Sequence, residues 1–191
     1  MSKNRYASVA ALASALTVAL ASCASPPGAD DDVNGASSGT PVSSSATTTS
    51  GAATSGGDGN AAQNAIETAQ SEVGGTATDI DFNDDNQWDV TVVDNSKATE
   101  VILDANGGNI LHQEGSEPLD SEDQKEFDSA QTTLADALTT ATDEHPGNIN
   151  DAELTTHNNT AIYDIDLYAG ANNSQVTVRV NATSGDIVTT I

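Results

Sequence analysis

The chain has 191 residues but only one cysteine, five lysines and arginines together, one tryptophan, three tyrosines and two phenylalanines. One cysteine excludes an internal disulfide and any metal site built from several thiolates. Against the five basic residues stand 29 aspartates and glutamates, which gives a formal net charge of −24. Such a chain repels nucleic-acid phosphates and anionic lipid head groups, so the charge argues against nucleic-acid binding and electrostatic adsorption to membranes.

Long apolar runs are absent except at the N-terminus. Lys3 and Arg5 precede an uncharged stretch, residues 7–21, that is mostly Ala, Val and Leu. Its length suits the apolar region of a signal peptide and is short for a membrane span. It ends in Leu20-Ala21-Ser22-Cys23, which resembles the lipobox of bacterial lipoproteins. The resemblance implies that Cys23 receives a diacylglyceryl thioether and becomes the new N-terminus. The alternatives are an ordinary secretory signal in which Cys23 is incidental, or an uncleaved anchor helix.

The next segment has almost nothing to bury. From residue 24 to about residue 60 the chain is Ser, Thr, Gly, Ala and Pro with a short acidic cluster and two isolated valines. Such a composition predicts disorder, with a root-mean-square span of about 35 Å. The sequence thus predicts a signal peptide over residues 1–22 and a lipidated cysteine with its tether over residues 23–60. The expected location is extracytoplasmic, anchored by lipid to the cell membrane. A leader with no length requirement is the alternative for the tether.

Beyond the tether the chain becomes periodic. Apolar residues at helical spacing from Ala62 to Val73 predict a helix that Gly74-Gly75 ends. Residues 88–92 alternate between apolar and polar, as in a strand with one buried face. Residues 101–111 predict two further strands around a glycine turn.

The same order of elements then repeats. A helix start at Ser121 and an apolar stripe from Phe127 to Ala141 predict one helix, ended by His145-Pro146-Gly147. Strands are expected around residues 152–155 and 161–168. Residues 163–167 copy the pattern of residues 88–92 at an offset of 75 positions, and residues 178–188 align with residues 101–111 at an offset of 77. The change in offset places a two-residue insertion in the hairpin loop between them.

Both copies resemble the PepSY domain family, which has a helix, an aromatic-x-aliphatic-x-aliphatic strand and a strand that enters a V-x-V-D-A-x-T-G-x-I/V turn. The matching segments are 88–92 with 103–110, and 163–167 with 180–187. The resemblance implies an α+β fold of two tandem units, residues 61–115 and 119–191, each one helix on a small antiparallel sheet. The family occurs in propeptides of secreted metallopeptidases and in cell-envelope proteins, where it is thought to restrain peptidases. No catalytic residues are known for it.

In each unit we expect the motif residues to have a mainly structural role. Trp88 and Tyr163 are expected to fill the space between helix and sheet, because aromatic side chains bury the most area. The alternative is an aromatic anchor exposed for a partner. Gly108 and Gly185 are expected to take the positive φ that a tight hairpin requires. Each unit has a thin core, so we expect the two to pack together or to share one sheet.

No catalytic, cofactor or metal residue is indicated. The three histidines, His112, His145 and His157, are far apart and are expected to be solvated. The alternating acids from Asp79 to Asp85 resemble the start of a calcium loop, but the pattern then lacks its glycine and its final glutamate. A polar hairpin is the favoured interpretation, and weak Ca²⁺ binding stays open.

Three hypotheses for the function remain. The first is a non-catalytic cell-surface lipoprotein that binds or regulates a protein or peptide, such as an extracytoplasmic peptidase, through a sheet edge or an acidic face. The second is an acidic binding module for divalent cations or basic ligands at the cell envelope. The third is a purely structural envelope component.

Overall fold

The computed structural model describes residues 56–191. The predicted signal peptide, Cys23 and nearly all of the predicted tether lie outside these residues. Among the described residues, no helix is both long enough and apolar enough to cross a membrane.

The first repeat begins with helix α1, Gly59–Val73. The carboxylate of Asp58 accepts hydrogen bonds from the backbone N–H groups of Asn60 and Ala61, which would otherwise lack partners at the start of the helix. Gly74 ends the helix at φ 83°, a left-handed conformation that glycine adopts without strain. The predicted helix and its glycine stop are confirmed.

A four-stranded antiparallel meander follows α1. Its strands are β1 (Thr76–Phe82), β2 (Trp88–Asp94), β3 (Lys97–Leu103) and β4 (Ile110–Gln113). A two-residue strand, β5 (Glu117–Pro118), also pairs with β3. The strands expected from the alternating patterns are therefore present, preceded by β1.

The second repeat has the same plan with one difference in its helical part. Where one helix was predicted from Ser121 to Ala141, two are present: α2 (Ser121–Ser129) and α3 (Leu134–Glu144). The prediction of one helix was wrong because Ala130 is extended and the N–H groups of the next two residues both donate to the carbonyl oxygen of Ala182. Thr133 then caps α3 by accepting from the N–H of Asp136.

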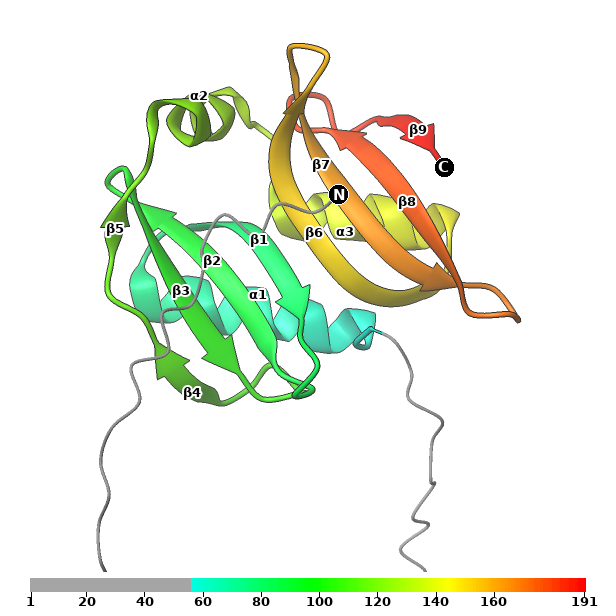
Figure 1. The fold of residues 1–191 in the computed structure, drawn as a ribbon, viewed down its shortest axis with the longest axis horizontal. Helices are drawn as coiled ribbons and strands as arrows, with labels where there is room; N and C mark the ends of the chain where they lie inside the picture. Colours follow the sequence, from blue (N-terminus) through cyan, green and yellow to red (C-terminus); the bar gives the residue numbers. More distant parts are fainter. Residues whose placement is uncertain (1–55) are drawn as a thin grey trace, which may run out of the picture. The chain divides into compact units, whose positions relative to one another are not determined.

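Four strands complete the second repeat: β6 (Gly147–His157), β7 (Thr160–Ala169), β8 (Ser174–Asn181) and β9 (Ile187–Thr190). Within residues 56–191, all strands belong to one nine-stranded antiparallel sheet with the order β4-β3-β2-β1-β6-β7-β8-β9 and β5 beside β3 (Figure 1). The first strands of the two repeats, β1 and β6, pair with each other at its centre. The expected α+β fold is confirmed, and of the two expected arrangements the repeats adopt the continuous sheet.

Helices α1 and α3 cover one face of this sheet and leave the other facing the viewer in Figure 1. Trp88 and Tyr163 are 0% and 1% exposed, so they pack between helix and sheet as predicted and are not exposed anchors. Each also satisfies its polar atom: Trp88 Nε1 donates to the carbonyl oxygen of Ala105 at 3.2 Å, and the Tyr163 hydroxyl to that of Thr132 at 3.0 Å.

The turn between β3 and β4 differs from the prediction. Its positive φ, 70°, is at Gly107 and not at Gly108, whereas Gly185 takes 77° in the second repeat as expected. In the first repeat the N–H of Gly107 closes a four-residue turn on the carbonyl oxygen of Asp104, while the second repeat closes a five-residue turn from Gly185 to Asn181. The shorter turn moves the left-handed residue one position earlier.

Candidate binding surfaces

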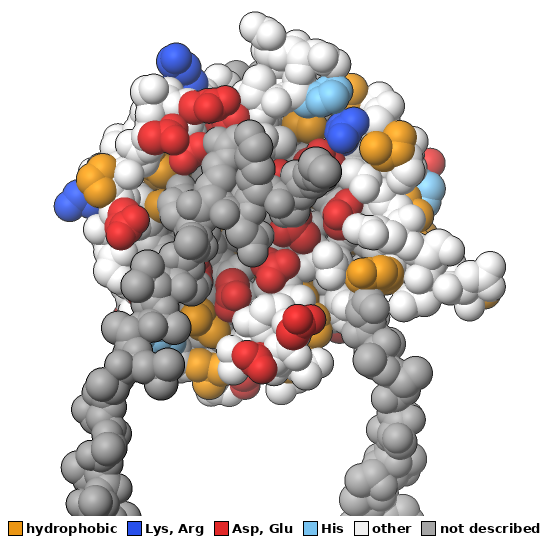
Figure 2. Space-filling model, in the orientation of Figure 1, with side chains coloured by type: hydrophobic (Ala, Val, Ile, Leu, Met, Phe, Trp, Pro, Cys, Tyr) orange, Lys and Arg blue, Asp and Glu red, His pale blue; other side chains and the backbone are white. Residues whose placement is uncertain are grey.

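The sheet face opposite α1 and α3 carries rows of carboxylates. In β1 the core residue Ile80 alternates with Asp79 and Asp81, and in β6 the core residue Ala152 lies between Asp151 and Glu153. Because successive side chains of a strand point to opposite faces, the acids lie on the face away from the helices. Red side chains gather on this face in Figure 2.

Strand register places these acids directly opposite one another. One row runs across β2, β1, β6 and β7 through Asp89, Asp81, Asp151 and Asp166. A second row contains Asp79, Glu153 and Asp164. Side chains directly opposite have Cβ atoms about 5 Å apart, and like charges in such pairs are destabilising. We call these seven residues the acidic face.

The outer members of the acidic face have partners nearby. Both carboxylate oxygens of Asp89 accept from the Asn83 amide at 3.1 Å, and Asp166 accepts from the Thr177 hydroxyl at 2.5 Å. The Arg179 guanidinium donates to Asp164 at 3.2 Å.

The centre of the acidic face is different. Within residues 56–191 neither Asp81 nor Asp151 has a hydrogen-bond or ion-pair partner, although the two residues are directly opposite each other. Burial, and next the charge of Asp81, raise the pKa of Asp151 to about 8. Burial, and next the charge of Asp89, raise the pKa of Asp81 to about 6. Asp81 and Asp151 therefore titrate in the near-neutral pH range, where ordinary aspartates are fully ionised.

Asp79, in the second row, also has a raised pKa. Burial raises the pKa of Asp79 to about 7, a hydrogen bond from Thr78 acts in the opposite direction, and the charge of Glu153 adds to the increase. The two strands at the junction of the repeats thus contribute three carboxyl groups with raised pKa values. This concentration of carboxyl groups gives the acidic face a chemistry suited to cations and basic side chains.

The residues of the calcium-loop pattern have separate places. Asp79 and Asp81 lie in β1. Asn83 lies in the turn that follows, where its side-chain oxygen accepts from the backbone N–H groups of Asp85 and Gln87. No group of three or more His, Cys, Asp or Glu side chains that could hold a metal ion occurs among residues 56–191.

The three histidines occupy three separate places. His112 lies in the edge strand β4, where Nε2 is 3.3 Å from a carboxylate oxygen of Glu114 and the imidazole is 60% exposed. His145 follows the last turn of α3, and His157 is exposed at the end of β6.

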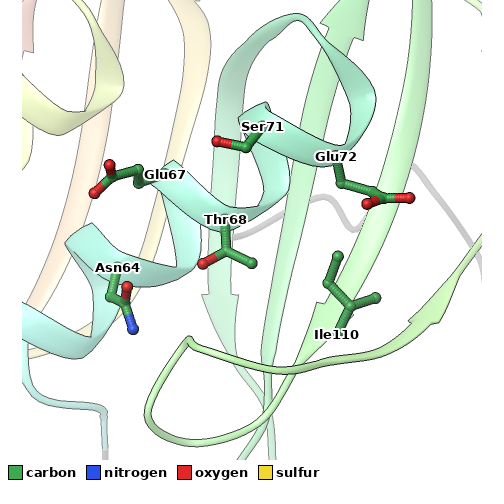
Figure 3. A pocket seen from close by; sticks show the side chains of 6 residues that line it. All are labelled: Asn64, Glu67, Thr68, Ser71, Glu72 and Ile110. Carbon is green, nitrogen blue, oxygen red and sulfur yellow. The ribbon is translucent and has the colours of Figure 1, made fainter.

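A second surface lies at the β4 edge of the sheet. A groove of about 450 Å³ separates the outer side of α1 from β4 (Figure 3). It is lined by Asn64, Glu67, Thr68, Ser71, Glu72 and Ile110. Ile110 and its neighbour Leu111 are 36% and 53% exposed. Their equivalents in β9, Ile187 and Val188, are similarly exposed, at 36% and 54%.

Sequence reasoning did not identify the groove or the rows of acids. Alternating acids are visible in β1, β6 and β7, and they indicate one polar face for each strand. Their convergence, however, depends on the pairing of β1 with β6, which no local pattern specifies. The groove depends on how closely the β3–β4 turn approaches α1.

Comparison with known proteins now gives the family. The PepSY family, described as peptidase propeptide and YPEB domain, matches residues 61–114 and 133–190, more than half of the chain. No curated protein matches. Among solved structures, a "putative lipoprotein" from Clostridium difficile 630 shares 20% sequence identity, with a TM-score of 0.41 over 66% of this chain and 89% of that one. The chain belongs to the PepSY family and carries two copies of its domain.

Proposed function

We propose that this chain is a non-catalytic module outside the cytoplasm that binds a basic region of a protein partner on its acidic face. The single observation that supports the proposal most is the row of four aspartates across β2, β1, β6 and β7. Opposed like charges cost stability, and a cationic partner would recover that cost by neutralising them. PepSY domains are generally non-catalytic modules of the propeptide type, which agrees with a binding role.

A binding titration tests this proposal. The probe is a decalysine peptide, and the protein is the mature chain from residue 23, with Cys23→Ser to prevent acylation. We expect binding at pH 8.5, above the pKa values of Asp81 and Asp151, that weakens steeply between 50 and 200 mM NaCl, because exposed charges are screened by salt. The double variant Asp81→Asn/Asp151→Asn should lose about tenfold in affinity.

A matched variant controls for total charge. Asp143→Asn/Glu144→Gln removes two acids at the exposed end of α3 instead of two from the acidic face. It should change affinity by less than about twofold. Equal losses in the two double variants would mean that net charge alone attracts the peptide, and the acidic face would then have no special role.

A peptidase is the partner that the family description suggests, since it includes peptidase propeptides. If the chain restrains an extracytoplasmic peptidase, deletion of the gene for this chain should raise peptidase activity in the envelope fraction. Expression of the wild-type chain in the deletion strain should lower that activity again. Complementation with Asp81→Asn/Asp151→Asn should restore less inhibition. Envelope peptidase activity that does not respond to the deletion would remove this form of the proposal.

The location is part of the proposal. Acyl chains on Cys23 would hold the module at the membrane, since two or more chains anchor a protein far better than one. Residues 24–55 would then separate the folded part from the lipid.

Weak Ca²⁺ binding is the second candidate, favoured by the direct opposition of Asp81 and Asp151 where β1 pairs with β6. A divalent cation between opposed carboxylates would reduce their repulsion. Millimolar Ca²⁺ should then raise the melting temperature of the mature chain beyond a NaCl control of equal ionic strength. Identical melting temperatures in the two solutions would remove this candidate.

A further inference from the structure

The β4 edge is separate from the acidic face and has features of its own. We propose that the edge of β4, with the groove beside α1, is a docking site for an extended polypeptide strand that carries lysine or arginine. The strand would add to the sheet next to β4 and place a basic side chain in the groove. This inference goes beyond the proposed function, because it concerns a different surface and a different mode of recognition.

At one end of the groove, the turn between β3 and β4 packs closely against α1. At Gly107 an added Cβ would lie 2.3 Å from the carbonyl oxygen of Ala61 and 2.5 Å from the backbone nitrogen of Ala65. The turn between β3 and β4 can approach α1 this closely only because it has glycine there. The Asn64 amide also donates to the carbonyl oxygen of Asn106 at 2.9 Å. A preformed groove lowers the entropic cost of binding.

Among residues 56–191, no strand pairs with the outer side of β4. The sheet order ends at β4, and the N–H of Glu114 donates to the carbonyl oxygen of Glu100 in β3. Because N–H and C=O groups of successive residues point to opposite sides of a strand, those of Gln113 point away from β3. An added strand would hydrogen-bond to these groups, as in other cases of strand addition to a sheet edge.

The groove has two carboxylates on its α1 side and one aliphatic side chain on its β4 side. Glu67 and Glu72 contribute two carboxylates, and α1 contains neither lysine nor arginine. Ile110 offers aliphatic surface on the other side of the groove. A lysine or arginine suits both features, since its methylene stem packs on apolar surface while its charged end reaches a carboxylate. The hydroxyls of Thr68 and Ser71 add acceptors for its N–H groups.

Charge also decides between a basic strand and a second copy of the chain. Pairing β4 with β4 of another molecule would bring two negatively charged grooves together, in molecules that each carry a net charge of −24. Such a dimer is disfavoured by repulsion, whereas a basic strand is attracted.

The test uses the heptapeptide Lys-Thr-Lys-Thr-Lys-Thr-Lys, capped at both ends, and the mature chain with Cys23→Ser. Amide shifts in ¹H–¹⁵N spectra should move for β4 and for the groove side of α1. Two N-methylated peptides, with methyl groups on the lysine or on the threonine amides, each lack the donors of one strand edge. One of them should bind at least tenfold more weakly at β4 than the parent peptide.

Variants of the protein provide the matching evidence. Gln113→Pro removes an outward N–H and should abolish the β4 shifts, while proline is tolerated on an edge strand. Thr190→Pro makes the same change at the equivalent position of β9, opposite Val178 as Gln113 is opposite Val101, and should leave the β4 shifts intact. Glu67→Gln/Glu72→Gln should weaken binding at β4 about fivefold.

Three results would overturn the inference. The first is equal binding at β4 by both N-methylated peptides and the parent, since strand addition requires backbone donors. The second is movement only of residues on the acidic face, which would leave the proposed function standing. The third is concentration-dependent broadening of β4 amides without peptide, which would identify a second copy as the occupant.

Discussion

Replacement of Asp151 by asparagine should stabilise the protein at alkaline pH. The substitution keeps the size of the side chain and removes one of the two charges that face each other where β1 meets β6. A carboxyl group whose pKa is higher in the folded than in the unfolded state destabilises the fold once it ionises. That penalty is absent below the unfolded pKa, near 3.8, and is complete above the folded pKa, about 8.

The size of the effect follows from the shift. One pKa unit corresponds to about 1.4 kcal/mol, so the shift of Asp151 from 3.8 to about 8 has an upper limit of about 6 kcal/mol. Asp151 is only partly buried, and water screens its charge. We therefore expect Asp151→Asn to raise the free energy of unfolding by about 2 kcal/mol at pH 8.5 and by less than about 0.5 kcal/mol at pH 4.

Urea unfolding at half-unit pH intervals from 4 to 9 measures this difference. Glu67→Gln is the control, because Glu67 is exposed on α1 on the opposite side of the sheet. Its effect should stay within about 0.5 kcal/mol at every pH. A difference between Asp151→Asn and wild type that is the same at pH 4 and pH 8.5 would refute the reasoning, because it could not come from ionisation of Asp151.

Three further predictions concern single side chains. Gly107→Ala should lower the free energy of unfolding by about 2–4 kcal/mol, because the added Cβ would meet the backbone of α1. Gly74 is also left-handed but has open space around it, so Gly74→Ala should lower the free energy of unfolding by only about 1 kcal/mol in the same urea titration; equal costs for the two variants would contradict the close approach of Gly107 to α1. Tyr163→Phe should cost about 1–2 kcal/mol by leaving the carbonyl oxygen of Thr132 without its donor, and a neutral result would mean that water replaces it. Cys23→Ala should release the protein from membranes or leave its precursor unprocessed, and membrane association that persists after carbonate washing would contradict acylation.

Local patterns in the sequence predict much of this fold. Alternation from Trp88 to Val92 gives both the strand and its buried side, because a strand with one covered face must alternate. Helical spacing followed by glycine gives α1 and its end at Gly74. These features depend on neighbours along the chain.

Features that depend on distant residues could not be predicted in this way. The apolar stripe from Phe127 to Ala141 predicts one helix, but the chain leaves the helix near Ala130 to bond to Ala182 in the second repeat. The same is true of the acidic face, since the spacing of acids in β1 does not show that β6 will lie beside it. Pairing between distant strands is set by the whole core and not by either strand alone.

The meeting of carboxyl groups from the two repeats at the centre of one sheet is best tested by titrating the side chains themselves. The ¹³C shifts of the aspartate carboxyl groups, followed from pH 3 to pH 9, report each proton directly. Asp81 and Asp151 should titrate as a coupled pair with midpoints near 6 and 8. Two independent titrations with midpoints near the ordinary aspartate value of 3.8 would contradict this arrangement.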